Sequence, residues 1–292
     1  MNSRPIIERL AEPGPALSIE FFPPKDALGE EAFLRTVAET QAAFRPDFVS
    51  ITYGAGGSTR ERTLHYADLL KDECGLNVMP HLTCVGSSRA EILEIVRDYD
   101  ARGFRNLMAL RGDPPKGAAR FEPHPDGLAY AADLVALLHE AFPRLCLGVA
   151  GYPEVHPEAA SPRDDLGHLK RKVEAGAAFI TTQLFYRTDN FLRFVEQCRD
   201  AGITVPILPG LMPVLSASAA RRFCNDVPAE LGALLDEAGE DRERVREIGL
   251  DWAYRQICEL LEAGVVGIHL YLLNRTAIAR PLIERLKDAR LV

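Results

Sequence analysis

An acidic residue interrupts an apolar segment near the N-terminus. Residues 18–25 read SIEFFPPK, so that Glu20 is followed by two phenylalanines and two prolines. Burial in apolar surroundings disfavours an ionised carboxylate and raises its pKa. A carboxyl group that stays protonated near pH 7 can act as a general acid. Pairing with a buried arginine or lysine from another strand is the alternative explanation for Glu20.

Other polar side chains stand where predicted strands end. Because the carboxyl ends of barrel strands meet at one mouth, we expect these residues to surround a large ligand with many polar groups. Each of them alone is also explained as a cap or a loop hydrogen-bonder. Besides Glu20 they are Thr52, Tyr53, His81, Thr83, Arg111, Asp113, Tyr152, His156, Gln183, Tyr271, Asn274 and Arg275.

Three motifs near these strand ends have a structural and a functional interpretation. Arg111 and Asp113 in LRGDPP form either a surface ion pair or part of a site. The basic run 170–172 is either a solvated helix face or a neutraliser of pyrophosphate. His156 in YPEVHPE has no second histidine at ligand spacing, and the prolines prevent helical ligand geometry, so we expect no metal. A GxSxG elbow and a catalytic-cysteine signature are also missing, which argues against nucleophilic hydrolysis.

Short β-rich segments alternate with segments of helical period along the whole chain. The predicted strands are 17–22, 48–53, 77–84, 105–112, 146–152, 179–185, 205–211 and 266–273. The predicted helices are 29–44, 59–74, 89–102, 127–142, 162–176, 188–201, several within 216–263, and 276–288. Eight such units predict an α/β fold, a (β/α)8 TIM barrel.

The barrel is expected to be one domain over residues 1–292. Residues 1–15 form an N-terminal extension, and 216–263 form a helical insertion between the seventh and eighth predicted strands. A doubly wound open sheet is the structural alternative. It usually has a glycine fingerprint after its first strand, whereas this strand ends in FFPPKD, and GAGGST (54–59) has Thr59 at the last glycine position.

Composition narrows the class of partner. The net charge is -8 and the sequence has no basic block, which argues against nucleic acid and an anionic membrane surface. The N-terminus lacks the apolar core of a signal peptide, and no stretch reaches 18 apolar residues. The six cysteines form no CxxC pair, as expected for reduced thiols. We therefore expect a cytoplasmic protein that binds small molecules, and exposed apolar helix positions favour a homo-oligomer.

Nine motifs occur in one order between residues 17 and 288. They are SIEFFPPK, VSITYGAGGSTRERT, PHLTC, ALRGDPP, YPEVHPE, LKRKVEAGA, TQLFY, ILPGLMPV and YLLNR. In this order the chain resembles the methylenetetrahydrofolate reductase family, in its bacterial catalytic form. The resemblance implies a (β/α)8 barrel with non-covalent FAD, reduced by NADH or NADPH. It also implies that methylenetetrahydrofolate then enters the same pocket in a ping-pong cycle and is reduced to methyltetrahydrofolate.

The resemblance also implies roles for individual residues. Glu20 matches the general acid that assists opening of the folate ring. Asp113 matches a residue that lies near both the flavin and the pterin. Gln183, Tyr271 and Arg275 are assigned to substrate binding. Arg171 and Lys172 are expected to neutralise the pyrophosphate of FAD. The positions matched to FAD are Thr52, Tyr53, Ala55, His81, Arg111, Gly112, Asp113, Tyr130, Ala131, Tyr152, His156, Asp165, His168, Arg171 and Lys172.

One part of the sequence departs from the family pattern. Some relatives have an aromatic after PGLMPV that stacks on the nucleotide or folate, whereas this chain has Ala217 there. We expect Phe223, further along, to face the helix core, which leaves the electron donor open. The functional alternatives are a proline dehydrogenase-like flavoenzyme, a pterin-binding methyltransferase barrel and a non-catalytic flavin- or folate-binding protein.

Overall fold

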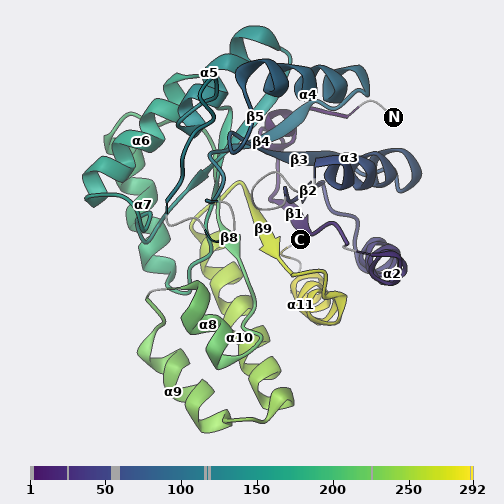
Figure 1. Cartoon of the computed structure of the whole chain (residues 1–292). Coiled ribbons are helices and arrows are strands. Elements are labelled where there is room, and N and C mark those ends of the chain that lie inside the picture. The colour runs from purple at the N-terminus through teal and green to yellow at the C-terminus, as the bar shows by residue number, and fades with distance from the viewer. Residues whose placement is uncertain are drawn as a thin grey trace.

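The computed structural model describes residues 3–24, 26–53, 60–114, 117, 120–224, 226–289 and 291. Parallel strands form a ring that is surrounded by helices (Figure 1). The strands are β1 (Ala16–Phe21), β2 (Phe48–Ile51), β3 (Val78–Thr83), β4 (Asn106–Leu110), β5 (Cys146–Gly151), β6 (Phe179–Thr182), β7 (Ile207–Leu208), β8 (Gly210–Leu211) and β9 (Gly267–Tyr271). The (β/α)8 fold class predicted from the sequence is confirmed.

The helices follow the strands in the alternating order of a barrel. They are α1 (Ile6–Leu10), α2 (Ala27–Ala43), α3 (Arg60–Asp68), α4 (Arg89–Ala101), α5 (Ala131–Ala141), α6 (Pro162–Glu174), α7 (Thr188–Asp200), α8 (Ala217–Phe223), α9 (Ala229–Ala238), α10 (Arg242–Glu262) and α11 (Thr276–Asp288). A π-helical turn, η2 (Leu69–Glu73), continues α3. The predicted helix 127–142 begins later, at Ala131.

The seventh predicted strand, 205–211, is divided at Pro209. Its first half, β7, pairs with β6, and its second half, β8, pairs with β9. Proline has no N–H to donate to a strand ladder, which explains the interruption. The Pro209 carbonyl still accepts a hydrogen bond from the His269 N–H at 3.0 Å. The divided strand therefore joins β6 to β9 and completes the ring.

Side chains alternate between the inside of the ring and the surrounding helices. In β1, Ile19 and Phe21 pack in the large core between strands and helices. Ser18 and Glu20 point the other way, and Ser18 contacts His269 of β9 within the ring. The same alternation along β9 directs His269 and Tyr271 inward. Strand register thus fixes which polar residues can meet inside the barrel.

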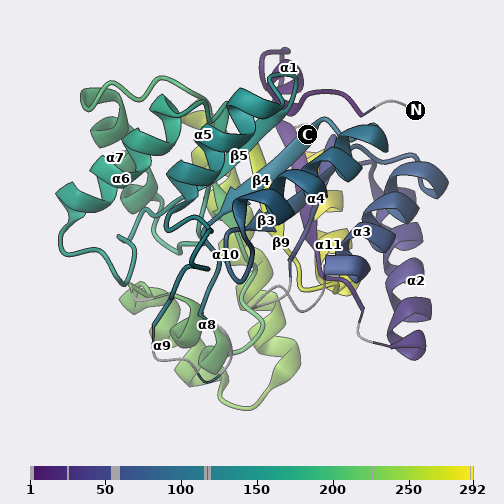
Figure 2. The ribbon, with the colours of Figure 1, turned by 45° about the horizontal axis from the view of Figure 1, so that its top comes forward.

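The first helix closes the end of the barrel at which the strands begin. Ile6 and Leu10 of α1 pack in one cluster with inward residues of the strands, including Phe48, Met108 and Phe179. The Ile6 N–H donates to Oδ1 of Asn106 at 2.7 Å. Figure 2 shows α1 at one end of the molecule and α8 and α9 at the other. The cavity described below therefore opens at the opposite end from α1.

The insertion between β8 and β9 consists of α8, α9 and α10. Helix α8 is capped by Ser216, whose hydroxyl accepts from the Ala219 N–H, and α10 is capped by Asp241, whose carboxylate accepts from two N–H groups of that helix. A separate apolar cluster, which includes Leu231, Leu235 and Val245, holds the helices together. None of the described helices is both long and apolar enough to cross a bilayer.

Candidate active site

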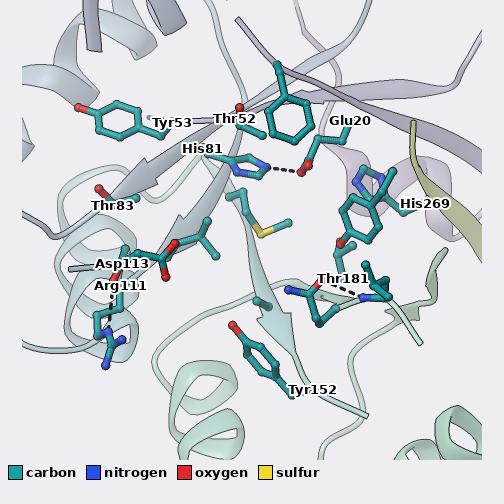
Figure 3. A pocket seen from close by; sticks show the side chains of 18 of the residues that line it. Glu20, Thr52, Tyr53, His81, Thr83, Arg111, Asp113, Tyr152, Thr181 and His269 are labelled. Carbon is teal, nitrogen blue, oxygen red and sulfur yellow. Dashed lines mark hydrogen bonds and ion pairs between the residues drawn. The ribbon is translucent and has the colours of Figure 1, made fainter. Parts of the chain in front are cut away.

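A cavity of about 620 Å³ lies inside the ring near the carboxyl ends of the strands. This is the end of a (β/α)8 barrel at which active sites form. Many residues predicted from strand ends line it, and Figure 3 shows several of them around the space. The predicted residues in the lining are Glu20, Thr52, Tyr53, His81, Thr83, Arg111, Gly112, Asp113, Tyr152, His156, Gln183 and Tyr271.

Glu20 and His81 point toward each other across the cavity wall (Figure 3). The Oε2 atom of Glu20 lies 3.4 Å from Nε2 of His81, and the Glu20 residue is 8% exposed. Burial raises the pKa of Glu20 to about 8, which a hydrogen bond with Ser50 partly opposes. Burial lowers the pKa of His81 to about 4. Both groups are therefore uncharged near pH 7, and the carboxyl carries a proton.

A histidine that the strand-end reasoning missed lies beside this pair. Nδ1 of His269 is 2.8 Å from the Ser18 hydroxyl, and its Nε2 is 3.5 Å from the Ser50 hydroxyl. Burial lowers the pKa of His269 to about 3, so the ring is neutral. His269 stands two residues before Tyr271 on the same strand, and the period of a strand could have placed it in the cavity.

Tyr271 connects the cavity wall to a neighbouring strand. Its hydroxyl donates to the carbonyl oxygen of Thr182 at 2.8 Å. Gly210 lies against both groups, because a Cβ there would be 2.2 Å from the Thr182 oxygen and 2.5 Å from Tyr271 Cε2. The ring can occupy this position only because residue 210 has no side chain. Tyr271 is thereby held with its ring in the cavity lining.

The loop after β4 supplies a carboxylate and an arginine. Gly112 has φ +90°, and a Cβ there would lie 2.9 Å from Thr83 Cβ. The glycine therefore permits the turn that brings Asp113 to the cavity lining. Arg111 makes two hydrogen bonds to the Glu158 carboxylate, at 2.6 and 2.9 Å, and its guanidinium lies over the Phe121 ring. This contact connects the loop after β4 to the loop after β5.

The loop after β5 supplies two aromatic rings to the cavity. Tyr152 and His156 pack edge to face with ring centroids 4.6 Å apart. The His156 N–H donates to Oδ2 of Asp165 at 3.0 Å, which ties this loop to α6. Lys172 is half-buried behind the loop, and its Nζ donates to the Ala150 carbonyl at 2.5 Å. Burial lowers the pKa of Lys172 to about 8 despite the nearby Asp165.

Several predicted cofactor and substrate residues lie outside the cavity lining. Tyr130 stands at the start of α5, next to Ala131, and is 60% exposed. Its ring stacks on that of His168, with the ring centroids 6.4 Å apart. Arg171 is exposed and contacts His168. Arg275 is exposed at the start of α11. Ala55 lies outside the described residues.

The expectation for Phe223 is wrong. Phe223 ends α8, is 44% exposed and lines the cavity instead of facing the helix core. The Cys224 side chain that follows it is the one that packs in the core of the insertion. Ala217, which replaces the expected aromatic, packs against the same core. The aromatic residue that α8 places at the cavity is therefore its last residue, Phe223, and not its first, Ala217.

Two buried hydroxyl groups in the cavity wall have no hydrogen-bond partner among the described residues. They belong to Thr83 on β3 and Thr181 on β6, and both residues line the cavity. A buried polar atom without a partner loses its hydration without compensation. Apolar side chains, among them Met108, Leu110 and Leu184, cover other parts of the wall. The cavity therefore suits a large ligand with an apolar face and polar edges.

Comparison with known proteins gives one consistent family. The model of the methylenetetrahydrofolate reductase family matches residues 6–287. The 5,10-methylenetetrahydrofolate reductase of Escherichia coli (strain K12) is 38% identical over 274 residues, which cover 92% of this chain and 90% of that protein. Methylenetetrahydrofolate reductase (NADH) 1 of Zea mays is 38% identical over 283 residues, which cover 92% of this chain and 48% of that protein.

A solved structure has a similar fold at low sequence identity. An uncharacterized protein from Clostridium thermocellum that binds two copies of 5-methyl-5,6,7,8-tetrahydrofolic acid superimposes with a TM-score of 0.66. The two sequences are 14% identical, and the match covers 98% of this chain and 100% of that chain. This likeness supports the barrel fold.

Proposed function

Because this chain belongs to the methylenetetrahydrofolate reductase family, we propose that it reduces 5,10-methylenetetrahydrofolate to 5-methyltetrahydrofolate. The electrons would come from NADH or NADPH in a ping-pong cycle, with the nucleotide and the folate using one cavity in turn. The barrel, the cavity at the carboxyl ends of its strands and the sequence match over most of the chain support this proposal.

The observation that carries the proposal is the protonated carboxyl of Glu20. Reduction of the substrate to a methyl group requires its five-membered ring to open, and the departing nitrogen needs a proton. A group with a pKa of about 8 holds that proton at neutral pH and can still release it. Glu20 also lines the cavity in which the folate would lie. It is therefore the general acid of the proposed reaction.

Neutral histidines allow Glu20 to keep its proton. A protonated His81 at 3.4 Å would favour the carboxylate and turn the acid into an ion pair. Burial instead keeps both His81 and His269 uncharged near neutral pH. Once Glu20 has donated its proton, His81 Nε2 and the Ser50 hydroxyl remain beside the carboxylate as its polar neighbours.

The cavity wall fits the FAD that the family uses. The unpartnered hydroxyls of Thr83 and Thr181 offer hydrogen bonds to the polar edges of a flat ring system, and Met108 and Leu110 offer an apolar surface. FAD would be held by other residues of the cavity lining and by residues along α5 and α6. Those in the lining are Thr52, Tyr53, His81, Arg111, Gly112, Tyr152 and His156, and those along the two helices are Tyr130, His168 and Arg171. FAD held there would supply the hydride-transfer chemistry that links the nucleotide to the folate.

Residues at the mouth would orient the two substrates. Asp113 and Gln183 can hydrogen-bond the amide and amidine edges of a pterin. The exposed ring of Phe223 offers a stacking surface for a pterin or a nucleotide base. Tyr271 contributes another ring to the lining.

An anaerobic visible spectrum of the purified protein tests the proposal. We expect a flavin spectrum that bleaches with NADH or NADPH and returns when methylenetetrahydrofolate is added. Bleaching without recovery would show that the reduced flavin passes its electrons to an acceptor other than methylenetetrahydrofolate. A protein that stays colourless after incubation with FAD would refute the flavin-dependent reaction.

A further inference from the structure

A contact between Cys224 and Glu154 joins two segments that supply residues to the cavity lining. One is the turn after β5, which carries Tyr152 and His156, and the other is the end of α8, which carries Phe223. Sγ of Cys224 lies 2.9 Å from Oε1 of Glu154. Cys224, which follows Phe223, is thus hydrogen-bonded to Glu154, which lies between Tyr152 and His156 in the sequence.

The geometry of the Glu154 turn shows that surrounding contacts hold it. The Val155 N–H donates to the Tyr152 carbonyl at 3.2 Å, which closes the turn around Glu154. Val155 has φ +69°, a left-handed conformation that is costly for a β-branched residue. Such a conformation persists where neighbouring contacts fix it. The Cys224 contact supplies one of these constraints, and the bond from the His156 N–H to Asp165 supplies another.

The environment of Cys224 suits a hydrogen-bond donor. Cys224 is 4% exposed and packs in the core of the insertion with Tyr186 and Leu231. Burial and the Glu154 carboxylate raise the pKa of the thiol to about 12, so it stays protonated. A protonated, buried thiol is a poor nucleophile and is unreactive toward oxidants. Donation to a carboxylate is the role that remains.

A second contact anchors the same segment. Oδ2 of Asp226 accepts from Nδ2 of Asn190 at 3.0 Å, at the start of α7. Trp252 of α10 donates from Nε1 to the Tyr186 carbonyl at 3.0 Å, which attaches the insertion to the segment after β6. These contacts hold the insertion on the barrel, whereas the Cys224 contact reaches the turn that carries Tyr152 and His156.

We propose that the hydrogen bond from Cys224 to Glu154 is a clasp that holds the Phe223 ring at the cavity mouth in position for a flat heteroaromatic ligand. Cys224 and Glu154 are positioning residues and do not touch the reacting atoms. The inference rests on the proposed function for the identity of that ligand, which is either the nucleotide base or the pterin. Separate half-reactions distinguish these two sources.

The kinetic test uses the FAD-loaded enzyme with Cys224→Ala and Cys224→Ser. Loss of the donor in Cys224→Ala should raise the Kd or KM of the ligand that stacks on Phe223 by about tenfold, with the rate at saturation unchanged. Serine restores a donor, so Cys224→Ser should recover most of the affinity. Cys198→Ala, which removes another buried thiol, on α7 and outside the cavity lining, is the matched control and should change neither constant. An equal response of Cys224→Ala and Cys198→Ala would overturn the clasp.

A second readout needs no turnover. A thiol that donates to a carboxylate has a lowered S–H stretching frequency. The infrared difference between wild type and Cys224→Ala assigns the S–H band of Cys224. This band should shift to higher frequency in Glu154→Leu, because the acceptor is lost. Fluorescence of Trp252, the one tryptophan in the sequence, shows whether the insertion remains folded in each variant. An unshifted band with unchanged fluorescence would refute the clasp, whether or not the enzyme reduces folate. Loss of folate reduction in the wild type with a shifted band would instead refute the proposed function alone.

Discussion

Oε2 of Glu20 lies 3.4 Å from Nε2 of His81, and burial moves the two pKa values in opposite directions. The distance is short enough for an ion pair, yet a pKa of about 8 for the acid and about 4 for the base leaves both neutral at pH 7. The contact is therefore a close approach of two neutral groups in which Glu20 holds the proton. This protonation state allows an acid to act inside an apolar barrel.

Replacement of Glu20 by glutamine should separate the two half-reactions. Glutamine keeps the size and hydrogen-bonding capacity of the side chain but cannot supply an acidic proton. In Glu20→Gln, reduction of bound flavin by the nucleotide should stay near the wild-type rate, and folate reduction should fall by about 10²- to 10⁴-fold. Rapid-mixing absorbance of the flavin measures both steps, and wild-type rates in both would remove Glu20 from the mechanism.

The folate half-reaction should lose rate in alkaline solution. Because Glu20 acts in its protonated form, the single-turnover rate of flavin reoxidation by methylenetetrahydrofolate should fall as the pH rises through about 8. Reduction of the flavin by the nucleotide, which needs no proton from Glu20, is the internal control. A rate that stays constant to well above pH 8 would contradict the assignment.

Stability should also depend on the protonation of Glu20. Its pKa is raised from 4.5 to about 8 on folding, so its contribution is fully present below pH 4.5 and is lost as the pH rises through 8. Between these values the folded state holds one more proton than the unfolded state. The free energy of unfolding of wild type relative to Glu20→Gln should therefore fall by about 1.4 kcal/mol per pH unit. Urea denaturation at a series of pH values measures this difference, and a constant difference would contradict the raised pKa.

The neutral histidines should produce the opposite slope in acid. Burial lowers the pKa of His81 to about 4 and that of His269 to about 3, from 6.5. Their contribution is present above pH 6.5 and is lost as the pH falls toward those values, because the unfolded state takes up protons first. His269→Asn should reduce the acid loss of stability in the same urea series while the alkaline loss remains. An unchanged acid limb would show that His269 is already charged in the folded protein.

Gly112 should tolerate no side chain. Gly112→Ala places a Cβ 2.9 Å from Thr83 Cβ and 3.0 Å from Val85 Cγ1, in a backbone conformation of φ +90°. We expect a loss of about 2–4 kcal/mol in the free energy of unfolding, with reduced flavin content. Gly202→Ala is the matched control, because Gly202 has φ +81° and an added Cβ would meet no atom within 4 Å. Equal losses in the two variants would show that the contact with Thr83 costs nothing.

The sequence was sufficient to predict the barrel because its strands and helices have clear periods. Short β-rich apolar segments between segments of helical period marked the strands, and Glu20 was recognised because a carboxylate is rare in such a segment. The division of 205–211 was harder to predict, since a proline in a strand can mark an edge or an interruption. Only the pairing of β7 with β6 and of β8 with β9 shows how the segment is used.

The site was predictable where the strand ends carry polar residues and less so elsewhere. His269 and Thr181 lie within strands, where their type alone does not separate a ligand contact from a buried hydrogen-bonding residue. Phe223 was misplaced because helix period cannot show whether the last residue of a short helix faces the core or the barrel. Its position depends on how the insertion packs, and that is set by contacts between residues far apart in the sequence, such as Cys224 with Glu154.

The division at Pro209 gives the ring of strands a seam. β7 and β8 each pair through two residues, whereas β1 pairs with β2 through four and with β9 through five. Because fewer ladder pairs hold the sheet here, we expect local unfolding to open the barrel at this seam first. The Tyr271 hydroxyl bridges β9 to β6 directly across the seam through the Thr182 carbonyl. A side chain of the cavity thus also fastens the barrel, and any ligand that displaces Tyr271 loosens the wall that holds it.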